Sequence, residues 1–67
     1  MAPNAPNPQT RQAALQTAMT LQRQYGEDAE VIATLRAAEV AAAGDNEALE
    51  HWDAVIQILA DGPGTLN

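Results

Sequence analysis

The chain has 67 residues, so it forms one small domain at most. It contains no Cys, Ser or Lys, which leaves no disulfide and few of the side chains that commonly act as catalytic nucleophiles. Nine acidic residues against three Arg give a formal net charge of −6. This charge argues against a nucleic-acid partner and against an anionic membrane surface.

The chain opens with a Pro-rich segment and then becomes helical in pattern. Pro3, Pro6 and Pro8 lack backbone donors and disfavour the helical region for the residues before them, so we expect residues 1–8 to form a flexible arm. The first helix is expected over residues 9–25, with Thr10 or Asn7 as its N-cap. Its predicted core face consists of apolar residues at helical spacing: Ala14, Leu15, Ala18, Met19, Leu21 and Tyr25.

The second helix is expected over residues 28–43, after a left-handed turn at Gly26. An ion pair between Arg36 and Glu39 is expected on its surface. The helix has two apolar faces. We predict that the face with the larger side chains lies in the core: Val31, Ile32, Leu35, Ala38 and Ala42. The second, shallower face suits packing against a further neighbour: Ala29, Ala33, Ala37 and Val40.

The third helix is expected over residues 46–60. Gly44 fits a left-handed turn before it, and Asp45 fits its N-cap, accepting from the N–H of Glu47 or Ala48. Trp52 is the largest ring in the chain and is expected to anchor the core. The remaining members of its predicted core face are Ala48, Leu49, Val55, Ile56 and Leu59.

The pattern as a whole predicts an all-α fold, a three-helix antiparallel bundle with helices at about 9–25, 28–43 and 46–60. A disordered Pro-rich arm (residues 1–8) precedes the domain (residues 9–61), and a flexible tail (residues 62–67) follows it.

Catalytic and metal-binding patterns are weak. Glu47 and His51 share a helix face at a spacing of four residues, but zinc usually takes three or four protein ligands and the chain has one His and no Cys. The sequence also lacks a calcium loop and a glycine-rich phosphate motif. We therefore expect no catalytic residue, no metal, no cofactor and no small-molecule ligand, hence a protein that is not an enzyme.

The expected location is the cytoplasm. No apolar run approaches the roughly 18 residues of a membrane-spanning helix. The N-terminus also lacks the charged and apolar regions of a signal peptide.

The expected function is protein–protein interaction or self-association, for example as a homodimer. The outward strip of the third helix is the candidate partner surface: Glu47, Glu50, His51, Ala54 and Ile58. The shallower face of the second helix is a further candidate for such burial. The alternative is an acidic inhibitor or nucleic-acid mimic that binds a basic protein surface.

Two resemblances accompany these patterns. The residues Gly44, Asp45, Ala48, Leu49 and Trp52 make positions 44–52 similar to the joint of a tetratricopeptide-repeat helical hairpin. More broadly, the chain resembles short uncharacterised α-helical proteins of alphaproteobacteria, which implies a compact helical domain of unknown function. The residues that carry this second resemblance are Tyr25, Gly26, Ala29, Arg36, Gly44, Asp45, Trp52, Val55 and Leu59.

Overall fold

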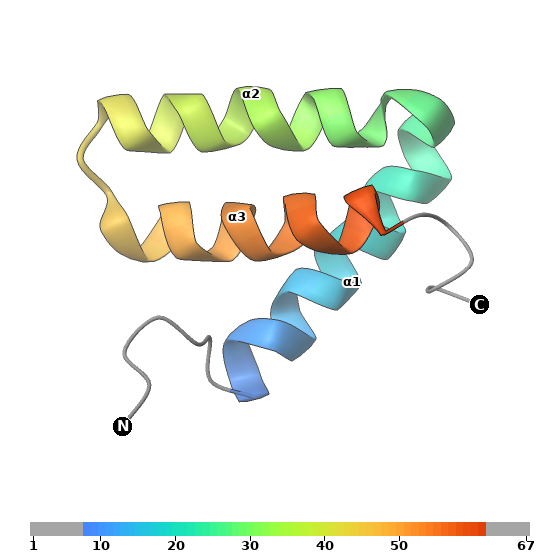
Figure 1. The fold of residues 1–67 in the computed structure, drawn as a ribbon, viewed down its shortest axis with the longest axis horizontal. Helices are drawn as coiled ribbons and strands as arrows, with labels where there is room; N and C mark the ends of the chain where they lie inside the picture. Colours follow the sequence, from blue (N-terminus) through green and yellow to red (C-terminus); the bar gives the residue numbers. More distant parts are fainter. Residues whose placement is uncertain (1–7, 62–67) are drawn as a thin grey trace.

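The computed structural model describes residues 8–61, with side chains from residue 11 onward. This part of the chain is all-helical and contains no strand. The α-helices are α1 (Pro8–Tyr25), α2 (Ala29–Ala42) and α3 (Asn46–Ala60), and a 3-10 turn, η1 (Gly26–Asp28), joins the first two (Figure 1). The predicted arm and tail lie outside the described residues, except for Pro8.

The prediction of three separate helices was wrong at the first joint. The helical elements follow one another with no intervening loop from Pro8 through η1 to Ala42, so the described chain consists of two helical segments. The first segment bends at Gly26, whose φ of 56° confirms the predicted left-handed position. Asp28 belongs to η1, and the second helix therefore begins one residue later than predicted.

The antiparallel arrangement holds for α2 and α3, which lie side by side in Figure 1, whereas α1 crosses beneath them at a steep angle. Both α1 and α2 pack mainly against α3 and touch each other less. The chain is therefore an α2–α3 hairpin with α1 laid across it, which differs from the predicted up-and-down bundle.

Two helix-capping motifs, one at the end of α2 and one at the start of α3, form the turn of the α2–α3 hairpin. Gly44 has a φ of 78°, and its N–H donates to the carbonyl of Ala41 at 3.1 Å, while the N–H of Asp45 donates to the carbonyl of Val40 at 3.0 Å. These two bonds form a Schellman motif, which requires a left-handed residue at Gly44. The Asp45 carboxylate then accepts from the N–H of Ala48 at 3.1 Å, which confirms the predicted N-cap of α3.

The start of α1 also differs from the prediction. Pro8 was assigned to the flexible arm but is the first residue of the helix, where its missing N–H and fixed φ are tolerated. Thr10 lies inside α1 and is therefore not its N-cap. The alternative cap, Asn7, lies outside the described residues.

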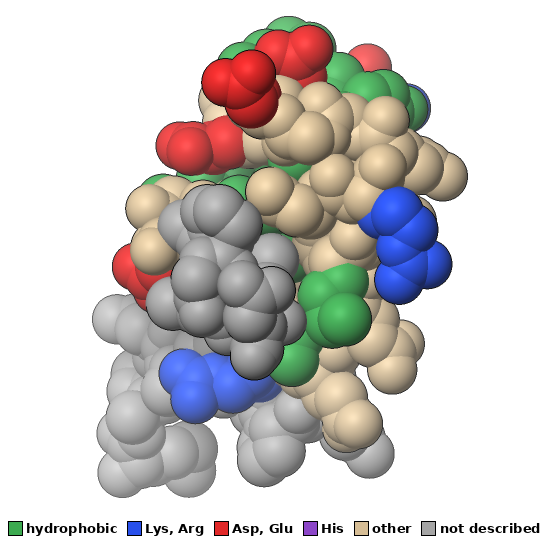
Figure 2. Space-filling model, turned by 90° about the vertical axis from the view of Figure 1, so that its right-hand side faces the viewer, with side chains coloured by type: hydrophobic (Ala, Val, Ile, Leu, Met, Phe, Trp, Pro, Cys, Tyr) green, Lys and Arg blue, Asp and Glu red, His purple; other side chains and the backbone are tan. Residues whose placement is uncertain are grey.

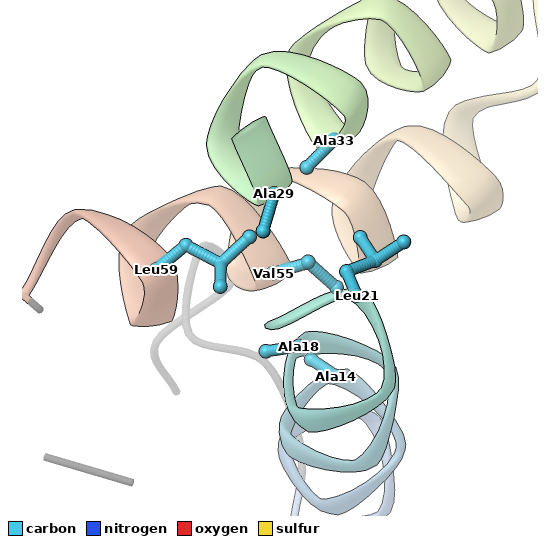
Figure 3. Close-up of a cluster of buried hydrophobic side chains, with 7 residues drawn as sticks. All are labelled: Ala14, Ala18, Leu21, Ala29, Ala33, Val55 and Leu59. Carbon is cyan, nitrogen blue, oxygen red and sulfur yellow. The ribbon is translucent and has the colours of Figure 1, made fainter. Parts of the chain in front are cut away.

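Small side chains dominate the core. Among residues 11–61, Val55 is the largest side chain that is fully buried. Figure 3 shows that the cluster draws on all three helices, with side chains pointing toward one another from α1, α2 and α3. Its members are Ala14, Ala18, Leu21, Ala29, Ala33, Val55 and Leu59. Four of these seven are alanines, so the helix backbones themselves must approach closely to exclude water.

The two apolar faces of α2 are the reverse of the prediction. Ala29, Ala33 and Ala37 are buried, whereas Val31 and Leu35 are 57% and 58% exposed. The alanine face allows the closest approach of α2 to α3, and the turn at η1 brings Ala29 against the core. Ala38 and Ala42, predicted to be core residues, are also exposed. Ile32 is half-buried and packs against the cluster.

The predicted role of Trp52 as core anchor is confirmed only in part. Its side chain is half-buried and packs against the core cluster from the outside. Helices that meet at alanine leave too little space to enclose an indole ring. Tyr25, another predicted core residue, is 44% exposed.

The orientation of α2 can be tested with one substitution at two positions. Ala33→Leu should destabilise the fold by about 1–3 kcal/mol, because the larger side chain enters a site with no free space. The matched control is Ala38→Leu on the same helix, which should change stability by less than about 0.5 kcal/mol. Urea unfolding followed by circular dichroism measures both, and equal losses would contradict the assigned faces.

The left-handed turn at Gly44 gives a second stability prediction. A Cβ at this position would meet no atom within 4 Å, so any cost arises from the backbone conformation. Gly44→Ala should cost about 1–2 kcal/mol of unfolding free energy. Gly44→Asn is the control and should cost less, because Asn tolerates positive φ better. An alanine variant as stable as the native protein in thermal unfolding would rule out a left-handed Gly44.

Candidate functional site

The described residues hold no cluster that would serve as a metal site. No group of three or more His, Asp or Glu side chains is close enough to share an ion within residues 8–61. Glu47 and His51, which share a face of α3, form no ion pair with each other. The ion pair in this part of the chain joins Arg36 to Glu39 at 3.1 Å on the surface of α2, as predicted.

His51 has a structural partner that the sequence did not reveal. Its Nε2 lies 3.2 Å from the Thr17 hydroxyl on α1, across 34 residues of sequence, in a partly buried position. The hydroxyl donates when Nε2 is unprotonated and accepts when Nε2 carries the proton. The His51 ring also meets the Trp52 ring edge-on, with centroids 5.3 Å apart and an interplanar angle of 83°. The imidazole therefore helps to join α1 to α3.

A hydroxyl next to an imidazole is also the arrangement of a catalytic nucleophile and its general base. Among the described side chains, no carboxylate hydrogen-bonds the other ring nitrogen of His51 to orient it. Thr17 also lies in the middle of α1, where backbone N–H groups are bonded within the helix and cannot stabilise an oxyanion. The pair therefore fits a packing contact better than an active site.

Shallow hollows open on the surface of the described residues. One, of about 360 Å³, is lined by Ala13, Gln16, Thr17, Thr20 and Leu21. Another, of about 300 Å³, is lined by Gln22, Gly26, Glu27, Ala29, Glu30 and Leu59. No described buried side-chain nitrogen or oxygen lacks a hydrogen-bond partner, so no orphaned polar group points to a missing ligand in either hollow.

The five residues of the predicted partner surface have different surroundings. Glu47 and Glu50 are exposed on α3. His51 is half-buried and bonded to Thr17, while Ala54 and Ile58 are half-buried and pack against the core cluster. Within this strip, the glutamates are the side chains most open to a partner, and the strip as a binding surface stays a prediction. The other surface proposed for a partner, the alanine face of α2, is buried inside the chain.

The structure instead exposes a continuous apolar face on α2. We call it the outer α2 face, defined by Val31, Leu35, Ala38 and Ala42. At 100° per residue these positions cluster on one side of the helix, opposite Ala29, Ala33 and Ala37. Single exposed apolar residues are ordinary, but here the larger apolar face of the helix is the exposed one.

Charge is divided unevenly along the fold. α1 contains Arg11 and Arg23 and no acidic residue, a formal charge of +2. Residues 26–61 contain nine acids and Arg36, a formal charge of −8, and the two sum to the net −6 of the chain. Figure 2 shows acidic side chains gathered where α2 begins, with cationic side chains lower on the same face, toward α1.

Within residues 8–61, no helix combines the length and apolar character that crossing a bilayer requires. No family model, curated protein or solved structure matches the chain. The two resemblances noted from the sequence therefore stay predictions.

The contact between His51 and Thr17 leads to a stability prediction. Thr17→Val keeps the side-chain shape and removes the hydroxyl, so it should cost about 1 kcal/mol of unfolding free energy. Thr20→Val is the matched control on the same helix, because the exposed Thr20 hydroxyl donates to the Gln16 carbonyl within α1. If Thr17→Val costs the same in a His51→Ala background as in the native chain, the interhelical bond contributes nothing.

Proposed function

We propose that this chain is a non-enzymatic protein-interaction module and that it docks through the outer α2 face. The observation that carries the proposal is the orientation of α2, which buries its alanines and exposes Val31 and Leu35. Covering these side chains on binding would remove apolar surface from water, which is the main favourable term in most protein association.

The chemistry of the chain supports a binding role over a catalytic one. The described residues hold no metal-ligand cluster, and the Thr17–His51 pair lacks an orienting acid. A small core of alanines also yields little net stability, and a partner that binds the folded state adds to it.

The acidic alternative uses a different surface. An inhibitor or nucleic-acid mimic would dock through carboxylates on α3, such as Glu47 and Glu50, and its binding would weaken strongly with salt. The two functions therefore predict different contact positions and different salt dependence.

Site-specific photo-crosslinking tests the proposal. The crosslinking amino acid p-benzoylphenylalanine is placed at Leu35 or, as a matched exposed control on α3, at Glu50. We expect discrete crosslinked products from position 35 in a lysate of the source cells. Excess unlabelled native chain should suppress them, and excess Leu35→Asp chain should not, because a buried unpaired carboxylate is costly.

Two results would contradict the proposal. Crosslinks at position 50 alone, lost at high salt, would favour the acidic alternative. No specific product at position 35, either with another protein or with a second copy of the chain, would remove the outer α2 face as a docking site.

A further inference from the structure

A row of exposed side chains on α1 combines charge with apolar surface. Arg11, Leu15, Met19 and Arg23 follow one another at intervals of four residues, and we call them the basic ridge. Leu15 and Met19 are 38% and 40% exposed, and both Arg side chains are exposed as well. Neither Arg forms an ion pair with a described carboxylate.

A second row of four exposed side chains, matching the basic ridge in spacing, lies at the start of the acidic part of the chain (residues 26–61). Glu27, Val31, Leu35 and Glu39 are also spaced by four residues, and we call them the acidic ridge. Glu27 lies in η1 and the other three lie on α2. All four are exposed, and the ridge runs through the larger residues of the outer α2 face.

The two ridges have the same order of side chains and opposite charge. Each reads charged, apolar, apolar, charged, over twelve residue intervals. For the basic ridge, which lies wholly on α1, this is roughly 18 Å of helix. Rows at a spacing of four residues are the ridges that interdigitate in the commonest class of helix packing. Because each ridge carries like charges at both ends, the match holds whether the two helices run parallel or antiparallel.

The ridges are not matched to each other within one chain, since all eight side chains remain exposed. Glu39 does pair with Arg36 at 3.1 Å, but the two side chains are 64% and 57% exposed. Such an exposed pair contributes little and can be exchanged for a contact with another cation.

From this complementarity we infer that the partner of the outer α2 face is a second copy of this chain, which docks its basic ridge on the acidic ridge. This inference rests on the proposed docking role of that face and names its occupant. The apolar pairs supply burial and the terminal charges fix the register. The association places positive α1 against the acidic region of the other copy, which offsets the repulsion between two chains of net charge −6.

A charge-swap experiment tests the inference. The first variant, Arg11→Glu with Arg23→Glu, makes both ridges acidic, and the second, Glu27→Arg with Glu39→Arg, makes both basic. Sedimentation velocity over a dilution series should show association for the native chain and at least tenfold weaker association for each variant alone. An equimolar mixture of the two variants should recover association, because each contact then joins opposite charges.

The matched control changes the same charge elsewhere. Glu47→Arg with Glu50→Arg on α3 raises the net charge by four, from −6 to −2, as the second ridge variant does. This control should associate at least as well as the native chain. Circular dichroism verifies that every variant is folded, as expected for exposed positions.

The outcomes separate this inference from the proposed function. The native chain could stay monomeric at every concentration while the crosslinker at position 35 captures a different protein. That result would overturn the inference that the partner is a second copy, and it would leave the proposed docking face intact. Variants that associate like the native chain, or a mixture that does not recover, would also overturn the ridge pairing. Absence of both self-association and crosslinks would overturn both proposals.

Discussion

Close approach between helices at alanine is the constraint on which the rest of this structure depends. Ala18 on α1 and Ala33 on α2 are fully buried, and together with Val55 they bring three helices into contact around a core of few large side chains. Alanine loses little side-chain entropy on burial, but it also removes little apolar area from water. The core therefore depends on dense packing of small side chains, and the large Trp52 ring stays at its edge.

The same constraint decides what the surface offers. Because α2 presents its alanines to α3, Val31 and Leu35 face outward, and because α1 buries Ala14 and Ala18, Leu15 and Met19 remain partly exposed. Leu15 and Met19 thus lie in one exposed row and Val31 and Leu35 in another, on helices of opposite charge. The faces that α1 and α2 bury on folding therefore decide which apolar side chains remain exposed. The proposed interaction uses those exposed side chains.

Much of the local structure could be predicted from the sequence. The left-handed turns at Gly26 and Gly44 and the cap at Asp45 were confirmed, because a single residue type fixes each of them. Helix ends were predicted to within a residue. The failures concern side-chain environment: the buried face of α2, the edge position of Trp52 and the contact between His51 and Thr17. A second apolar face on α2 was visible in the sequence, yet hydrophobic periodicity ranked the larger side chains as more buried.

The sequence by itself determined that the described chain is helical, where it turns and how charge is distributed along it, since these properties depend on neighbouring residues. Only the tertiary structure decided that η1 joins α1 to α2 with no intervening loop, that α1 crosses the hairpin, and that Ala33 is buried in place of Leu35. The physical reason is that α2 is apolar on both sides, so its rotation cannot be read from its own pattern. That rotation is set by how closely its backbone can approach α3.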